Sequence, residues 1–367
     1  MIVGIDGRSL VGGQAGRGVA RYTAALTAAL AAAHGDDRWR LLLAGGPRAL
    51  PELEERANVD LVRRRSRRLR HLAAALAGRP RLERSLAGRI DVAWAPAPAP
   101  LAVGRSVPLV LTVHDLSFAE RRGDYTAYER LWHDLARLGA LARRAARLLA
   151  DSRVTAEAAL DRWRLDPARV VVVPPGVDRP ARAPDVAGAR ARHGLGERYL
   201  LFVGALEPRK APDVLAEGFA RARAAGLEAE LAVVGAGRRG AELDARGVRR
   251  LGAVADRRDL EALYAGAVAL VMPSRAEGYG LPPLEAAACG TPSVVSDLPV
   301  FRETLGDAAL RVPPGDPEAL AQALLRVAGD AALRDRLAGA AAARVAERTW
   351  ERAAALAYPV FAEAARE

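Results

Sequence analysis

The chain has 367 residues, enough for two ordinary α/β domains that each bury a core. Its net charge of +11 comes from 55 basic residues, all arginine except Lys210, against 44 acidic ones. A single cysteine, Cys289, excludes an internal disulfide and a cysteine-rich metal site. No apolar stretch approaches the ~18 residues of a membrane-spanning helix, and the first residues lack the pattern of a signal peptide, so we expect a cytoplasmic protein.

Strand-like and helix-like segments alternate along the chain. In the first half we expect strands at 1–6, 39–44, 89–94, 107–113 and 170–173, with helices near 21–33 and 125–147. In the second half we expect strands at 199–204, 231–235, 248–252 and 268–272. Apolar strands that alternate with helices predict an α/β fold with two doubly wound parallel sheets. The expected divisions are a first domain at 1–177, a linker at 178–197, a second domain at 198–348 and a final segment at 349–367.

The only lysine lies where a predicted strand ends. The strand at 199–203 runs into Gly204, and Arg209 and Lys210 come just before Pro212, which suits the first position of a helix. Free N–H groups and the positive end of the helix dipole favour an anion at such a position. In a chain that otherwise uses arginine, a retained lysine indicates a compact point charge. We therefore predict a diphosphate site here; the alternative is two exposed basic residues in a turn.

Two glutamates follow the next predicted strand end. Glu277 comes shortly after the strand at 268–272, and Glu285 comes eight positions later, near the start of a helix that Pro282 opens. Glycines at 278 and 280 allow a ligand to approach the backbone closely. Because each carboxylate accepts bidentate hydrogen bonds, we expect both to bind sugar hydroxyl groups. For Glu285, a purely structural role at the helix N-terminus is the alternative.

His114 lies at the carboxyl end of the strand at 107–113, where α/β sheets bind ligands, so we predict a place for it in the site. The alternative is a structural histidine. In the same half, the glycine-rich loop that ends at Gly18 connects the first strand to the first helix. Its N–H groups are expected to contact a leaving phosphate.

The segment from Gly235 to Gly240 fits the dinucleotide pattern G-x-G-x-x-G. It follows the second strand of its domain rather than the first, and no acidic residue ends a strand about 20 residues later. We therefore do not expect a dinucleotide cofactor. The chain has no P-loop, no G-x-S-x-G and no H-E-x-x-H motif, and no Asp-x-Asp pair to hold a divalent ion. We expect neither a metal ion nor a cofactor.

Several segments together resemble the retaining glycosyltransferases of family 4, and among them the bacterial branch similar to mannosyltransferase B. The most specific part is the motif Gly-x-x-Glu-Pro-Arg-Lys combined with the two glutamates. The matching segments are 4–8, 18–22, 113–118, 151–152, 175–178, 204–210, 277–285 and 288–292. The resemblance implies a GT-B fold, in which two Rossmann-like domains face a central cleft and the final helix, here 349–367, crosses back to the first domain.

The resemblance also implies a role for each predicted site residue. Arg209 and Lys210 would hold the donor diphosphate and stabilise the leaving group, and Glu277 would bind hydroxyls of the transferred hexose. His114 would lie against that hexose. The further donor contacts it implies are Gly18 near the β-phosphate, Gly204 in the diphosphate motif, the backbone of Gly278, Tyr279, Gly280 and Leu281 at the sugar and phosphate, Glu285 at the ribose, and Gly252 and Val254 near the base.

The sequence thus predicts a retaining, metal-independent transferase that moves a hexose, with mannose favoured, from a nucleotide-diphosphate sugar to a glycan, lipid-linked or small-molecule acceptor. The basic stretch from Arg63 to Arg89 is interpreted as a peripheral contact with an anionic membrane, or alternatively as a solvated helix face. Aromatic residues are sparse there, so we expect no nucleic-acid partner. A basic nucleic-acid- or membrane-binding protein without transferase activity, and an NAD-dependent oxidoreductase, are the alternatives.

Overall fold

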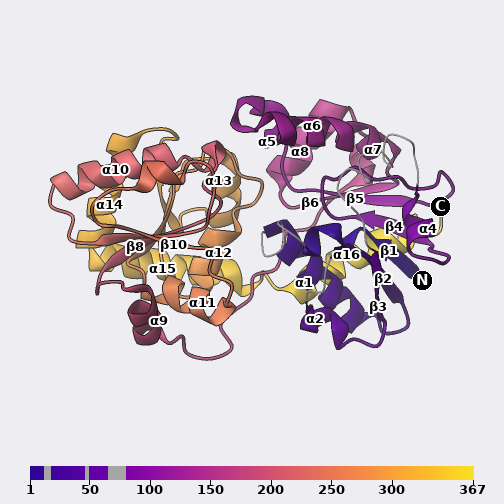
Figure 1. Cartoon of the computed structure of the whole chain (residues 1–367), viewed down its shortest axis with the longest axis horizontal. Coiled ribbons are helices and arrows are strands. Elements are labelled where there is room, and N and C mark those ends of the chain that lie inside the picture. Colours follow the sequence, from indigo (N-terminus) through magenta and orange to yellow (C-terminus); the bar gives the residue numbers. More distant parts are fainter. Residues whose placement is uncertain (12–17, 46–48, 65–79) are drawn as a thin grey trace. The chain divides into compact units, whose positions relative to one another are not determined.

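The computed structural model describes residues 1–11, 18–45, 49–64 and 80–367. The chain forms two compact units. Unit 1 comprises Met1–Gly176 together with Arg348–Glu367, and unit 2 comprises Val177–Glu347. Each unit contains one parallel sheet with helices packed against it, so the predicted α/β class is confirmed (Figure 1).

The sheet of unit 1 has the strand order β3-β2-β1-β4-β5-β6-β7. Its strands are β1 (Ile2–Ile5), β2 (Arg38–Ala44), β3 (Val59–Arg64), β4 (Val92–Ala95), β5 (Leu109–Val113), β6 (Arg147–Ala150) and β7 (Val170–Val172). The α-helices of this unit are α1 (Gly18–Ala33), α2 (Pro51–Glu54), α4 (Leu82–Ser85), α5 (Ser117–Glu120), α6 (Ala127–Ala136), α7 (Leu138–Arg144), α8 (Arg153–Trp163) and α16 (Trp350–Ala364).

Alternate residues of β4 belong to different cores of unit 1. Val92 and Trp94 pack in a cluster with α1 and α16, whereas Ala93 and Ala95 pack with α4, α7 and α8. This two-residue period is that of a strand buried on both faces. The last helix, α16, lies beside α1 (Figure 1) and inserts Phe361 against the indole of Trp94, with the ring centroids 5.3 Å apart.

The sheet of unit 2 has the order β10-β9-β8-β11-β12-β13, which is the Rossmann order 3-2-1-4-5-6. Its strands are β8 (Tyr199–Val203), β9 (Glu230–Val234), β10 (Val248–Gly252), β11 (Ala269–Met272), β12 (Ser293–Ser296) and β13 (Ala309–Val312). Its α-helices are α9 (Val186–His193), α10 (Pro212–Ala224), α11 (Arg257–Gly266), α12 (Leu281–Ala288), α13 (Pro299–Leu305), α14 (Pro317–Gly329) and α15 (Ala331–Ala346). The strand order reverses between β8 and β11, and this reversal is where such folds bind ligands.

The segment at 178–197, expected to link the domains, contains α9. Asp185 caps the start of this helix, and Gly194 ends it in a left-handed conformation. Ala189 of α9 is fully buried in a cluster with Tyr199 and Leu263, so this helix packs into the core of unit 2.

The basic stretch from Arg63 to Arg89 begins in a strand and not in a helix. Arg63 and Arg64 end strand β3, so the helix interpretation is wrong for these two residues. Arg63 pairs with Glu54 at 3.0 Å, and Arg64 donates to the carbonyl of Ser85. Residues 65–79 lie outside the described part of the chain.

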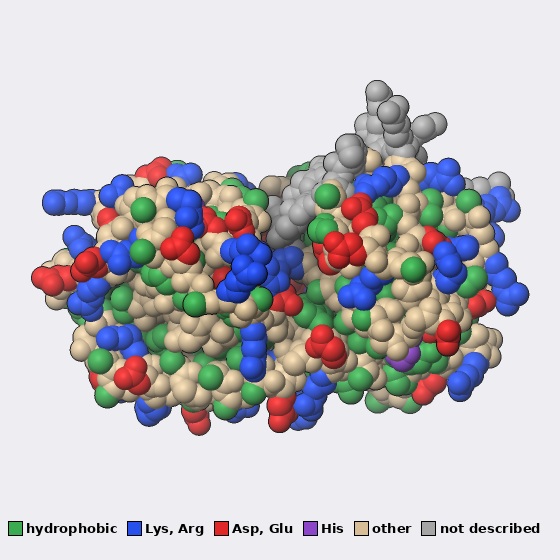
Figure 2. Space-filling view, turned by 90° about the horizontal axis from the view of Figure 1, so that it is seen from below, with side chains coloured by type: hydrophobic (Ala, Val, Ile, Leu, Met, Phe, Trp, Pro, Cys, Tyr) green, Lys and Arg blue, Asp and Glu red, His purple; other side chains and the backbone are tan. Residues whose placement is uncertain are grey.

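The charges on the face shown in Figure 2 are mixed in sign, because arginine side chains lie among aspartate and glutamate side chains rather than in one continuous patch. In the described ranges, no helix combines the length and the apolar character needed to cross a membrane.

Candidate functional site

Arg209, Lys210 and Glu277 meet where the strand order of unit 2 reverses. Arg209 and Lys210 follow β8 in the short 3-10 helix η5 (Pro208–Lys210), and Glu277 follows β11. Strands β8 and β11 are adjacent and parallel, so the loops at their carboxyl ends lie at the same edge of the sheet.

An ion pair joins Lys210 to Glu277. The Lys210 ammonium donates to Oε1 of Glu277, and the side chains are only 8% and 6% exposed. The hydroxyl of Ser274 donates to the same oxygen at 2.7 Å, and Nη1 of Arg209 lies 3.7 Å from Oε2. Arg209 remains 22% exposed, so two cations of different accessibility surround one carboxylate. A buried charge pair is costly to desolvate, which makes such an arrangement weak evidence for stability and stronger evidence for function.

A second ion pair ties the two loops together. Arg275, in the Glu277 loop, binds the Asp213 carboxylate with both terminal nitrogens, at 2.8 and 2.5 Å. Its side chain also donates to the carbonyl of Pro208, and its backbone N–H donates to the carbonyl of Arg209 at 2.7 Å. The hydrogen bonds from Arg275 hold the pKa of Asp213 below its ordinary value. No local sequence pattern indicates this contact, because Arg275 and Asp213 are 62 residues apart.

The backbone turns sharply just after Lys210. Ala211 adopts a left-handed conformation with φ of 52°, which costs a residue with a Cβ about 1–2 kcal/mol. Pro212 then opens α10 at the predicted position. Such a conformation persists only where surrounding structure enforces it, and here it lies between the buried Lys210 and the start of α10.

Glu285 lies in α12 and is anchored by a residue that the sequence did not single out. The hydroxyl of Tyr264, in α11, donates to Oε2 of Glu285 at 2.8 Å, and both residues are buried. The N-cap of α12 is Gly280, with φ of 84°. Pro282 and the next residue, also a proline, have no N–H, so the backbone donors at this helix end come from residues up to Leu281.

The glycines of the G-x-G-x-x-G segment serve the packing of adjacent loops. A Cβ on Gly235 would overlap the carbonyl of Gly204, and one on Gly237 would overlap the backbone of Leu206. The N–H of Gly235 donates to the carbonyl of Gly252 at 2.7 Å. These glycines therefore let the loops after β8, β9 and β10 lie close together, and they bring Gly204 and Gly252 to the same sheet edge.

In unit 1, His114 follows β5 and is held at both ring nitrogens. Nδ1 lies 2.7 Å from Oδ2 of Asp151, at the end of β6, and Nε2 lies 2.7 Å from the carbonyl oxygen of Pro96, after β4. Gly18 is exposed at the start of α1, and residues 12–17 of the predicted phosphate loop lie outside the described residues.

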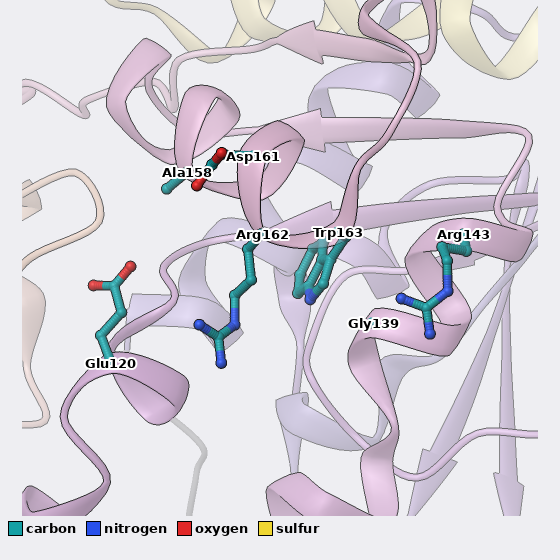
Figure 3. A pocket seen from close by; sticks show the side chains of 7 residues that line it. All are labelled: Glu120, Gly139, Arg143, Ala158, Asp161, Arg162 and Trp163. Atoms are coloured by element: carbon teal, nitrogen blue, oxygen red, sulfur yellow. The ribbon is translucent and has the colours of Figure 1, made fainter.

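A separate pocket of about 700 Å³ lies in unit 1 and contains none of the predicted site residues (Figure 3). It is lined by Glu120 of α5, Gly139 and Arg143 of α7, and Ala158, Asp161, Arg162 and Trp163 of α8. The contacts of Lys210 and Glu277 locate the candidate site better than this open, mixed-charge depression does. Cys289 is no nucleophile candidate, since burial raises the pKa of its thiol to about 12.

The fold and the loop geometry define a protein of two Rossmann-like α/β units with a cluster of charged side chains where the strand order of unit 2 reverses. Residues 16–179 match the family model described as Glycosyltransferase Family 4, and residues 197–330 match the model described as Glycosyl transferases group 1. The chain therefore belongs to the family-4, group 1 glycosyltransferases with the GT-B fold, as the sequence predicted.

Curated relatives include two proteins named D-inositol 3-phosphate glycosyltransferase. The one from Salinispora arenicola is 35% identical over 288 residues, covering 70% of this chain and 64% of the relative. The one from Frankia alni is 36% identical over 215 residues, covering 52% of each. The chain thus spans less than two thirds of the length of these relatives.

Two solved structures share the fold. Anabaena Alr3699/HepE, solved in complex with UDP and glucose, has a TM-score of 0.73 at 19% identity and covers 99% of both chains. WaaG, a glycosyltransferase involved in lipopolysaccharide biosynthesis, has a TM-score of 0.71 at 17% identity, covering 98% of this chain and 99% of that one.

Proposed function

We propose that the protein transfers a hexose from a nucleotide-diphosphate sugar to an acceptor hydroxyl group, with retention of anomeric configuration and without a metal ion. The observation that carries this proposal is the cluster of Arg209, Lys210 and Glu277 where the strand order of unit 2 reverses. Brought to that edge by neighbouring strands, the two cations suit the diphosphate of a donor, and the carboxylate suits sugar hydroxyls.

Charge stabilisation of the leaving group is the main chemical task. As the bond between the hexose and the diphosphate breaks, negative charge grows on the phosphate oxygens. A guanidinium and an ammonium fixed beside those oxygens stabilise the charge without having to reorganise. Glu277 keeps the Lys210 ammonium in place before the donor arrives and offers Oε2 to hexose hydroxyls. In this scheme His114 lies against the hexose.

We assign binding of the donor's nucleoside to the other predicted residues at this edge of the sheet. Glu285, oriented by Tyr264, accepts hydrogen bonds from the ribose hydroxyls. The loop of Gly252 and Val254 lies near the base, and the backbone of Gly278, Tyr279, Gly280 and Leu281 contacts the sugar and phosphate. Gly18 approaches the β-phosphate.

The names and titles of related proteins support particular candidates for the donor and the acceptor. Complexes of HepE with UDP and with UDP-glucose support a uridine nucleotide sugar as one donor candidate, beside the mannose donor favoured from the sequence. The names of the curated relatives support an inositol phosphate as one acceptor candidate, beside glycan and lipid-linked acceptors. Arg63 to Arg89 would place the enzyme on an anionic membrane face if the acceptor is lipid-linked.

A panel of UDP-, GDP-, ADP- and TDP-sugars tests the proposal, with release of nucleoside diphosphate measured with and without inositol phosphate and glycan acceptors. We expect turnover with at least one donor. We also expect the anomeric configuration of the product linkage to be the same as that of the donor. No turnover of any donor would count against a transferase. Co-sedimentation with anionic vesicles at low salt tests the membrane contact, and no binding removes it.

A further inference from the structure

The ring of His114 lies between two hydrogen-bond acceptors. A backbone carbonyl can only accept, so the Nε2 that lies 2.7 Å from the Pro96 oxygen must carry a proton. The Nδ1 lies 2.7 Å from Oδ2 of Asp151, so a second proton lies in that contact. This pair therefore holds two protons: either an imidazolium beside a carboxylate, or a neutral ring beside a protonated carboxyl group.

The charged arrangement is favoured because an imidazole ring holds a proton more tightly than a carboxylate does. Asp151 is 5% exposed, and its other oxygen, Oδ1, is buried with no hydrogen-bond partner in the described part of the chain. A buried carboxylate needs a positive partner, and the ring of His114 is in contact with it. The other titratable groups at this ring are Asp115, in the same loop, and Tyr22 of α1, whose ring meets it edge-on at 4.9 Å.

The raised pKa of His114 agrees with this geometry. Burial alone would lower the pKa of the imidazole. The charge and hydrogen bond of Asp151, together with the Pro96 carbonyl and the charge of Asp115, outweigh burial and raise the pKa above its ordinary value. The Asp151 carboxylate also contributes, after burial, to the high pKa of the Tyr22 hydroxyl.

We propose that Asp151 is a positioning residue that keeps His114 as an imidazolium, with its Nε2–H ready to donate to an oxygen of the bound sugar donor. This inference rests on the proposed function, which places the hexose beside His114. In the free protein the Pro96 carbonyl accepts the Nε2–H, and the donor oxygen shares or replaces that acceptor. A charge-assisted hydrogen bond is roughly twice as strong as a neutral one, so the cation suits a site where negative charge develops.

The test begins with nitrogen-15 NMR titration of the histidine side chains in the full chain, which has five histidines. His114→Gln assigns the signal. We expect both ring nitrogens of His114 to show imidazolium shifts at neutral pH, with a midpoint above that of an ordinary histidine. In Asp151→Asn the midpoint should fall by about one to three pH units. A wild-type His114 midpoint at or below that of an ordinary histidine, or an unchanged midpoint in Asp151→Asn, would overturn the proposal.

Activity provides the second readout. With a donor identified, Asp151→Asn should lower kcat/KM by about tenfold or more, because a charge-assisted hydrogen bond becomes a neutral one, and should move the alkaline limb of the pH profile to lower pH. Asp161→Asn, an exposed acid on α8, is the matched control and should change neither readout. Wild-type kcat/KM in Asp151→Asn at every pH would overturn the positioning role. A wild-type protein that turns over no donor would contradict the proposed function instead, and the NMR titration would still decide the charge state of His114.

Discussion

The ammonium of Lys210 and the carboxylate of Glu277 form a buried ion pair between loops that are 67 residues apart in the chain. Because of this contact, a substitution of Lys210 or Glu277 affects the stability of the fold as well as the chemistry of the site. Removing Lys210 leaves the buried Glu277 carboxylate with the more exposed Arg209 as its cation, and removing Glu277 takes the carboxylate away from the buried Lys210 ammonium. Loss of activity in a single variant would therefore mix a chemical effect with a folding effect.

A double-mutant cycle separates these effects. We predict that Lys210→Met and Glu277→Gln each lower the free energy of unfolding by about 3–5 kcal/mol, and that the double variant recovers part of the loss because both members of the buried pair are removed together. Urea unfolding of the four proteins measures the coupling. Strictly additive losses would show that the two side chains are not paired in solution.

The Arg275–Asp213 pair predicts a different outcome. Arg275→Lys keeps the charge but loses the bidentate contact, so the two loops should hold Lys210 and Glu277 less accurately and kcat/KM should fall by about tenfold or more. Arg302→Lys is the matched control, because Arg302 binds Asp297 with two nitrogens in the same unit and is 63% exposed. Similar activity in both variants would mean that Arg275 has no special part in positioning the site.

Much of this site could be predicted from the sequence, because its residues lie next to recognisable strand ends and helix starts. Lys210 precedes a proline-initiated helix, and Glu277 follows a strand end by a few residues. Their pairing depends on the adjacency of β8 and β11, which no local pattern encodes. Tyr264 and Arg275 were missed for the same reason, since their partners Glu285 and Asp213 are distant in the chain.

The strands that were not predicted from the sequence are mostly short. Strands β12 and β13 have four residues each, and β6 directly follows two helices. Such runs are too short for their periodicity to stand out from a buried helix segment. The strand β3 was hidden for another reason, because its end at Arg63 and Arg64 is part of an arginine run that we assigned to a membrane contact or a helix face.

The Tyr264–Glu285 hydrogen bond predicts selective weakening of nucleoside binding. Glu285→Gln should weaken binding of a nucleoside diphosphate by about tenfold but leave binding of inorganic pyrophosphate nearly unchanged, because the carboxylate is assigned to the ribose hydroxyls. Tyr264→Phe should show the same pattern more weakly. Calorimetric titration of both ligands checks this, and equal weakening of the two would remove Glu285 from the ribose contact.

The raised pKa of His114 predicts how stability depends on pH. Because the folded-state pKa lies above the unfolded value of about 6.5, protonated His114 stabilises the fold fully below that value, and the contribution is lost as pH rises through the folded-state pKa. The stability difference between the wild-type protein and Asp151→Asn should therefore shrink as the pH rises from below about 6.5 through the folded-state pKa. Urea unfolding at both ends of the range measures it, and a difference that grows with pH would reverse the assignment.

Metal removal should have little effect on turnover. Arg209 and Lys210 are proposed to stabilise the charge of the leaving group, so no divalent ion is required at the diphosphate. Incubation with EDTA followed by the donor assay tests this, with added Mg²⁺ as the comparison. Strong inhibition that Mg²⁺ reverses would favour a metal-assisted departure of the leaving group.

The most direct test of the central claim measures the affinity of the accepted donor's nucleoside diphosphate for the wild-type protein and for the double variant Lys210→Met, Glu277→Gln. The double variant removes both members of the buried pair together, so the effect on binding is separated from the effect on folding. We predict binding weaker by about tenfold or more, because a hydrogen bond to a charged group contributes about 1.5–3 kcal/mol. The control, Arg221→Met with Glu217→Gln, removes an exposed pair in α10 and should bind like the wild-type protein. Equal affinity in all three proteins would contradict a diphosphate site at Lys210.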